Sequence, residues 1–147
     1  MKVIGILMLM ATSILISIQI CKYEKYKIIY CDKMIYLASQ VSIFMKSVMP
    51  DTDMIFFFFL NSEKLKDIDI FDINSTSPLN KVENEKITEY INSIGKYDAQ
   101  TQIDKSTEFC DSFRLIKKDY QQFYSTHYKL IYAAGFSFGA LISILLI

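Results

Sequence analysis

The single histidine of the chain, His127, is the first candidate for acid–base catalysis or metal binding. An imidazole titrates near neutral pH, but it needs a paired nucleophile or a second ligand to form an active site. The neighbours of His127 are Tyr124, Tyr128 and Lys129, and the sequence contains no second histidine. We therefore expect His127 to be an interfacial, solvated residue.

Carboxylates and thiols give no stronger candidate. Asp67, Asp69 and Asp72 suggest a cation-binding loop, but the turn glycine and the downstream bidentate glutamate of a calcium hand are missing. The cysteines are odd in number without CxxC spacing, which is typical of buried, reduced thiols. They are Cys21, Cys31 and Cys110. Because the four glycines form no phosphate-binding loop either, we predict no enzyme activity, no metal and no cofactor.

The composition indicates where the apolar residues are. A chain of 147 residues suits one small domain, and a formal net charge of zero gives no electrostatic basis for binding nucleic acid. Hydrophobic residues make up 52% of the chain, yet 22% of the residues are charged. A chain rich in both kinds of residue is expected to gather its apolar residues in blocks.

Two uncharged blocks lie at the ends of the sequence, at 3–20 and 130–147. A helix of that length spans roughly 27 Å, enough to cross a thin hydrocarbon core, so membrane lipid is a predicted partner. The predicted fold is all-α. It has a transmembrane helix at 1–21, a small cytoplasmic helical bundle with an αα-hairpin at 22–129, and a transmembrane helix at 130–147.

A signal peptide is the alternative for the first block, because a single Lys2 precedes its apolar stretch. No small-x-small cleavage site follows, and Ile20 precedes Cys21 where lipoprotein processing needs a small residue. An uncleaved anchor is the better interpretation. Basic residues flank both blocks on the central side, which predicts a cytoplasmic central domain with both termini across the cell membrane. They are Lys22, Lys25, Lys27, Arg114, Lys117, Lys118 and Lys129.

The central part begins with a helix expected at 22–48, continuous with the first block and ended by Pro50. Asp51 or Asp53 can cap a second helix through 55–60. Its FFFFL run is apolar on all sides, so we expect a buried core element or a partner contact. The following residues, 61–81, are expected to form a loop with at most a short helical turn.

Two more helices are expected, at 82–94 after a cap at Asn80 or Asn84, and from Asp98 through 129 into the second block. The apolar residues of the last helix are mostly three or four apart and close to a heptad pattern, so they need a partner helix. That partner is either the 34–48 helix or another chain. The residues are Ile103, Cys110, Phe113, Ile116, Tyr120 and Phe123.

The stretch SIGKYDAQTQ, residues 93–102, joins these two helices. Gly95 follows the last apolar position of one helix, where a left-handed residue is commonly glycine. Asp98 can accept backbone N–H groups at the start of the next helix, so the stretch is predicted to be the corner of an αα-hairpin, with Lys96 and Gln102 exposed.

Glycines four apart mark the second apolar block. Gly135 and Gly139 lie on one face of a helix and form a groove that another helix backbone can approach closely. The sequence leaves the neighbour open between a second copy, the first helix and another protein.

Two segments, ITEYINSIGKYDAQTQIDKSTEFC and FYSTHYKLIYAAGFSFGALISILLI, resemble the stage III sporulation protein AB family over roughly residues 86–147. The family has a glycine, an acidic residue and a glutamine in the helix turn, which match Gly95, Asp98 and Gln102. Its basic-aromatic stretch and glycine-containing final helix match Tyr128, Lys129, Gly135 and Gly139. Residues 50–81 depart from the family, because they lack its regular helical pattern and its tryptophan.

The resemblance implies a non-enzymatic membrane component of the endospore-formation channel, located in the mother-cell membrane. Its central domain would be similar to the F domain of the type II secretion platform. It would dock a cytoplasmic secretion-type ATPase, stage III sporulation protein AA, together with other stage III sporulation channel proteins. The alternative is a generic small membrane scaffold that forms a homo-oligomer through its transmembrane helices.

Overall fold

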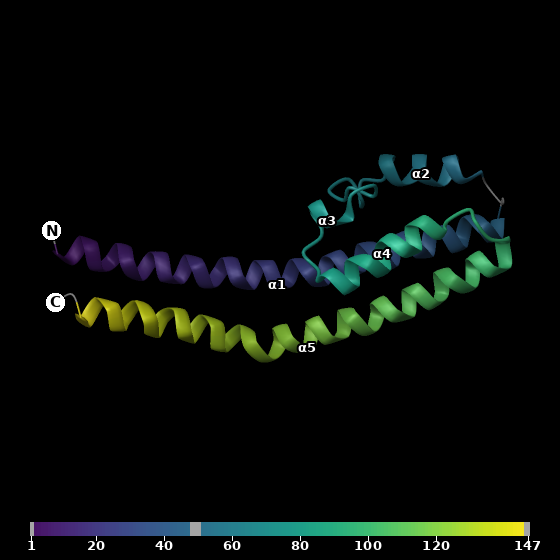
Figure 1. Ribbon diagram of the computed structural model, residues 1–147. Coiled ribbons are helices and arrows are strands. Elements are labelled where there is room, and N and C mark those ends of the chain that lie inside the picture. Colours follow the sequence, from purple (N-terminus) through teal and green to yellow (C-terminus); the bar gives the residue numbers. More distant parts are fainter. Residues whose placement is uncertain (1, 48–50, 146–147) are drawn as a thin grey trace. The chain divides into compact units, whose positions relative to one another are not determined.

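The structure, a computed structural model, describes residues 2–47 and 51–145, and every regular element within these ranges is an α-helix. In chain order the helices are α1 (Lys2–Ser47), α2 (Thr52–Asn61), α3 (Ile73–Thr76), α4 (Lys81–Ser93) and α5 (Ala99–Leu145), as Figure 1 shows. The predicted all-helical class is confirmed. The chain divides into a terminal unit, residues 1–26 with 119–147, and a central unit, residues 27–118, and each is described by itself.

Helix α1 joins the first apolar block to the segment after it, as predicted, since no proline and no further glycine interrupts its sequence after Gly5. It ends at Ser47, close to the expected position. Pro50, to which the end of this helix was assigned, lies outside the described residues.

Helix α2 starts where predicted, because Asp51 is its N-cap and the Asp51 carboxylate accepts a hydrogen bond from the Thr52 N–H. The FFFFL run, expected to be a buried core element or a partner contact, is buried only in part: Phe59 and the preceding Ile55 are buried, but Phe57 is 70% exposed. A short helix that docks by one face buries residues four apart and turns those between them outward.

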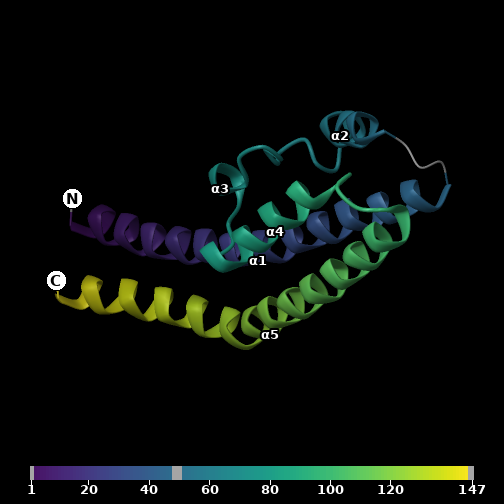
Figure 2. The same ribbon diagram turned by 45° about the vertical axis from the view of Figure 1, so that its right-hand side comes forward.

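In the central unit, α4 lies alongside the 27–47 part of α1 and the 99–118 part of α5, as Figures 1 and 2 show from two directions. The thiol of Cys110 donates to the carbonyl of Ile35, and Lys117 Nζ lies 2.7 Å from the Asp32 carboxylate. These contacts identify α1 as the partner helix that the apolar positions of α5 need. The largest fully buried side chains are Tyr30, Met34, Leu37, Ile55, Phe59, Leu65, Ile87, Gln102 and Phe113.

The buried face of α5 differs in part from the predicted one. Cys110 and Phe113 are buried as expected, but Phe123 is 46% exposed. Within the central unit, the other buried residues of α5 are Gln102, Ser106 and Phe109. Two of these three residues are polar, so the hydrophobic period alone does not reveal them.

A capping box begins α4. The Asn80 side chain accepts from the Glu83 N–H at 2.9 Å, and the Glu83 carboxylate accepts from the Asn80 N–H at 3.1 Å. The second candidate cap, Asn84, is instead buried and fixes the preceding loop by accepting from the Ser77 hydroxyl and donating to Asn74. That loop contains the short helix α3, which agrees with the single helical turn expected there.

In the terminal unit, the first part of α1 runs beside the last part of α5 (Figures 1 and 2). Among the described residues, α1 is the one helix long and apolar enough to cross a membrane, and its best window has a mean hydropathy of 1.8. The C-terminal helix does not pass the same test, so hydropathy does not support the transmembrane helix predicted at 130–147. Glycines, serines and a tyrosine lower its hydropathy, and its last two apolar residues lie outside the described ranges.

We expect Asn80→Ala to lower the free energy of unfolding of the central unit by about 1 kcal/mol, because the N-cap oxygen satisfies a backbone N–H of the first turn. Thermal melting of the full chain in detergent micelles, followed by circular dichroism, should show a midpoint lower by about 4–8 °C. The neighbouring Lys81→Ala, at an exposed side chain, is the control. Equal midpoints for the two variants would contradict a stabilising capping box.

Candidate functional site

The corner between α4 and α5 brings Gly95, Asp98 and Gln102 together. Gly95 has a φ of 79°, the left-handed conformation predicted for it. Asp98 accepts two hydrogen bonds from Thr101, one from the hydroxyl at 2.6 Å and one from the backbone N–H at 3.1 Å. These bonds, the hydroxyl bond foremost, lower the pKa of the Asp98 carboxyl and favour the ionised form that caps α5.

Gln102 is fully buried, so the expectation that it is exposed at the corner is wrong. Its Oε1 accepts a hydrogen bond from the Gly95 N–H at 3.3 Å. A helix that ends leaves backbone groups without helical partners, and this bond ties the end of α4 to the first turn of α5. The Gln102 Nε2 has no hydrogen-bond partner within the described part of the chain. Lys96, in contrast, is exposed as expected.

Buried polar contacts continue from the corner along α5. The hydroxyls of Tyr90 and Ser106 lie 2.8 Å apart, and Ser106 also donates to the Gln102 carbonyl at 2.7 Å. Burial raises the pKa of Tyr90 above its ordinary value, although the hydrogen bond to Ser106 opposes this shift. Tyr90 is therefore neutral at physiological pH and acts as a hydrogen-bonding link between the two helices.

Thr52, a residue that sequence analysis missed, lies against this corner. A Cβ placed on Gly95 would overlap the Thr52 Oγ1 and lie 3.0 Å from its Cγ2. Thr52 is the first residue of α2, so the missing side chain of Gly95 is what lets the start of α2 approach the corner. No sequence spacing predicts this contact, because it depends on the path by which residues 61–80 connect α2 to α4.

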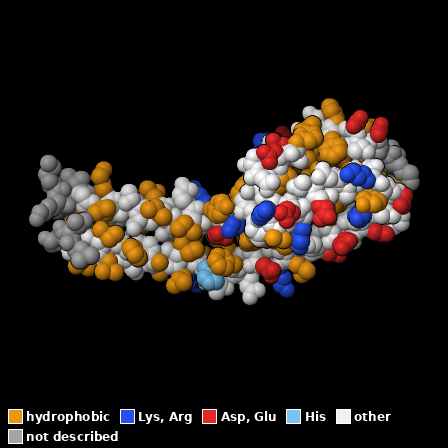
Figure 3. Space-filling view, in the orientation of Figure 1, with side chains coloured by type: hydrophobic (Ala, Val, Ile, Leu, Met, Phe, Trp, Pro, Cys, Tyr) orange, Lys and Arg blue, Asp and Glu red, His pale blue; other side chains and the backbone are white. Residues whose placement is uncertain are grey.

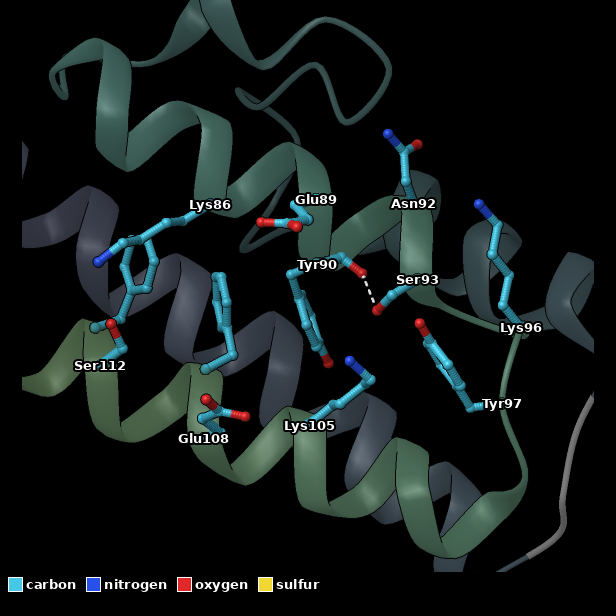
Figure 4. A pocket seen from close by; sticks show the side chains of 12 residues that line it. Lys86, Glu89, Tyr90, Asn92, Ser93, Lys96, Tyr97, Lys105, Glu108 and Ser112 are labelled. Atoms are coloured by element: carbon cyan, nitrogen blue, oxygen red, sulfur yellow. Dashed lines mark hydrogen bonds between the residues drawn. The ribbon is translucent and has the colours of Figure 1, made fainter.

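An open groove of about 600 Å³ lies between α4 and α5 next to the corner (Figure 4). Its floor is a row of stacked rings, with 4.2 Å between the centroids of Tyr90 and Phe109 and 4.4 Å between those of Phe109 and Phe113. Lysines and glutamates from both helices and from the corner form its rims. They are Lys86, Glu89, Lys96, Lys105 and Glu108. Histidine and cysteine are absent from this lining, and the floor rings are almost fully buried, so the exposed part of the groove is mainly its charged rims.

The thiols are packing groups. Burial, reinforced by Glu83 and Asp32, raises the pKa of the Cys31 thiol to about 12, so the nucleophilic thiolate is negligible at neutral pH. Burial also raises the pKa of Cys110. All three cysteines are free and buried, as the sequence predicted.

The other candidates for chemistry have local structural contacts. Asp67 pairs with Lys33, while Asp69 accepts hydrogen bonds from the backbone N–H groups of the two residues after Ile70. The Nδ1 of His127 lies 2.9 Å from the Phe123 carbonyl, and the two rings stack at 4.3 Å. These side chains shape a loop and a helix surface.

In the terminal unit the two glycines of α5 face α1. A Cβ on Gly135 would overlap the Ser17 Oγ and lie 3.1 Å from the Ser17 Cβ. A Cβ on Gly139 would lie 3.3 Å from the Ser13 Cβ and 3.4 Å from the Met10 Cα. Small residues four apart on α1 thus meet small residues four apart on α5, and the neighbour that the sequence left open is, in this structure, the first helix of the same chain.

Comparison with known proteins adds no relative: no family model, no curated protein and no solved structure matches this chain. The assignment of a function therefore depends on the corner, the groove and the small-residue contact described above.

We expect Gly95→Ala to destabilise the central unit by more than about 1–2 kcal/mol, because the left-handed conformation alone costs an alanine about that much and the overlap with Thr52 adds to it. The thermal midpoint of the full chain in micelles measures the loss. Adding Thr52→Ala should restore the part of the lost stability that comes from the steric overlap. The part that comes from the left-handed backbone conformation should remain lost. Lys96→Ala is the exposed control, and a Gly95→Ala midpoint equal to that of Lys96→Ala would refute this account of the corner.

We expect Gly135→Ala to weaken the contact between α1 and α5, because the added Cβ overlaps Ser17. Unfolding by titration with sodium dodecyl sulfate should then need less of the denaturing detergent than the wild type needs. Gly5→Ala is the matched control, since a Cβ there meets no atom within 4 Å. Ser17→Gly should restore the Gly135→Ala variant. If Gly135→Ala and Gly5→Ala unfold alike, the glycine contact does not stabilise the helix pair.

Proposed function

We propose that the protein is a non-enzymatic membrane adaptor, in which a pair of transmembrane helices anchors a helical docking domain. The observation that carries this proposal is the arrangement of side chains in the terminal unit. Small residues lie inside, since Ser17, Gly139 and Ser143 are buried. Large apolar residues point outward. They include Leu7, Met8, Leu15, Ile16, Leu130, Phe136, Phe138, Leu141 and Ile144, each at least 57% exposed.

A lipid environment accounts for this arrangement. An apolar surface of this extent does not remain uncovered in water, and close contacts between small residues are typical of transmembrane helix pairs. A soluble core helix fits poorly, because only 11% of the apolar window of α1 is buried. A cleaved signal peptide fits poorly as well, because cleavage would remove Ser13 and Ser17, on which the glycines of α5 pack.

The same arrangement supports a transmembrane role for the end of α5 despite its lower hydropathy. Gly139 and Ser143 contribute to that low value, but both are buried and need not face lipid. The Ser143 hydroxyl donates to the Gly139 carbonyl at 2.6 Å, so its polar group is satisfied within the helix. We place the central unit in the cytoplasm because the basic residues flank both apolar blocks on its side.

The partner in this proposal comes from the resemblance to stage III sporulation protein AB. The residues that carry it, Gly95, Asp98 and Gln102, form one hydrogen-bonded corner, which supports a shared structural motif. On this basis the central unit docks the secretion-type ATPase, stage III sporulation protein AA, at the mother-cell membrane, beside other channel proteins. A scaffold that self-associates through its glycines is less well supported, because Gly135 and Gly139 pack within the chain.

Three measurements on the full chain in a sporulating host test this proposal. We expect the protein to resist carbonate extraction from membranes. A Lys96→Cys variant should react with an impermeant maleimide only after permeabilisation, and the wild type should not react, because its own cysteines are buried. The ATPase should co-purify with the chain.

Each result overturns a different part. Release by carbonate would remove the anchor, and labelling in intact cells would reverse the orientation. Absence of the ATPase from the purified chain would remove the docking role and leave the anchor standing.

A further inference from the structure

The central unit carries an exposed apolar surface on α2 and at Phe71. Helix α2 buries Ile55 and Phe59 and turns three large side chains outward, with Met54 64%, Phe57 70% and Leu60 58% exposed. Phe71, 74% exposed, lies beside them because its ring stacks on Phe56 at 6.1 Å. We name this surface the α2 face and define it as Met54, Phe57, Leu60 and Phe71.

A partly enclosed hollow adjoins the α2 face. It has a volume of about 200 Å³ and lies between Phe56 and Phe71 on one side and Ile91 of α4 on the other. This volume is several times the roughly 30 Å³ that one water molecule occupies in the liquid. The hollow therefore has room for one apolar side chain. Protein interfaces place their strongest anchor residues in such hollows, whereas flat apolar surface contributes less.

Acidic residues surround this surface. The segment 51–72 holds six carboxylates and two lysines, a formal charge of −4 in a chain whose total charge is zero. Asp53 shares the exposed side of α2, Glu63 follows the helix, and Asp72 follows Phe71; all three are exposed. In Figure 3, acidic (red) side chains lie beside hydrophobic (orange) ones at the top of the view, where Figure 1 shows α2.

We infer that the α2 face binds a basic amphipathic helix of another protein, with an apolar anchor in the hollow and lysines or arginines against the acidic rim. The inference rests on the proposed role of the central unit as a docking domain. Charge complementarity selects this occupant. An anionic lipid surface would be repelled by the rim, and a second copy would set two acidic rims against each other.

Two synthetic peptides test the inference, one with leucine at i, i+3, i+4 and i+7 and lysine elsewhere, the other with glutamate in place of lysine. Binding is measured by fluorescence anisotropy with the full chain in nanodiscs of zwitterionic lipid, and empty nanodiscs are subtracted. We expect the lysine peptide to bind about tenfold more tightly than the glutamate peptide. Salt should weaken its binding.

Matched variants locate the binding surface. Phe57→Gln should weaken the lysine peptide about fivefold, whereas Leu115→Gln, at a side chain of α5 that is 66% exposed, should not. Glu63→Lys with Asp72→Lys should abolish the preference for lysine. Glu89→Lys with Glu108→Lys, the same change of charge placed on the α4–α5 groove, should preserve it. All four sites are exposed, so the variants are expected to keep the fold.

Three results with the peptides overturn the inference: equal binding of the two peptides, unchanged binding to the Phe57→Gln variant, or loss of the preference for lysine in the groove variant. Two results would assign the surface to another occupant and overturn it as well. They are binding of the wild type to anionic vesicles that Phe57→Gln removes, and a wild-type dimer that Phe57→Gln dissociates. Failure here differs from failure of the proposed function. If the ATPase co-purifies while the peptides do not discriminate, the adaptor stands and the surface is wrong. If the peptides discriminate and the ATPase does not co-purify, the surface stands and serves another partner.

Discussion

The reversal of the backbone at Gly95 is the constraint on which the central unit depends. Gly95 lies just after the end of α4, where the chain turns toward α5, and it leaves room for the first residue of α2. A left-handed backbone explains the turn, and the absence of a Cβ explains the close approach of Thr52. Gln102 and Asp98 then supply the hydrogen bonds that hold the corner.

The corner also shows what the sequence does and does not contain. Gly95 and Asp98 were predictable because helix ends have local chemical requirements that a single residue type meets. The burial of Gln102 and the contact with Thr52 were not, because each depends on segments that meet only after folding. The buried face of α5 illustrates the same limit. Phe113 follows the apolar period, whereas Ser106 is buried with hydrogen bonds to Tyr90 and to the Gln102 carbonyl.

The terminal unit inverts the usual relation between hydropathy and burial. Many large apolar side chains of α1 and α5 face outward, while Ser13, Ser17, Gly135 and Gly139, which lower the hydropathy, meet between the two helices. Composition therefore gives α5 a low hydropathy at the positions where this helix packs on α1. Composition also overestimates the burial of the FFFFL run in α2, because it specifies neither the helix face on which an apolar residue lies nor the residue that it contacts.

Because Thr52 packs against Gly95, the docking of α2, which carries the α2 face, is coupled to the folding of the α4–α5 hairpin. A molecule that binds only when α2 is docked draws on the same equilibrium that keeps the corner closed, so occupancy and folding are thermodynamically linked. The linkage is reciprocal: a substitution that destabilises the corner lowers the apparent affinity of the α2 face for its ligand, in proportion to the fraction of chains in which α2 is undocked.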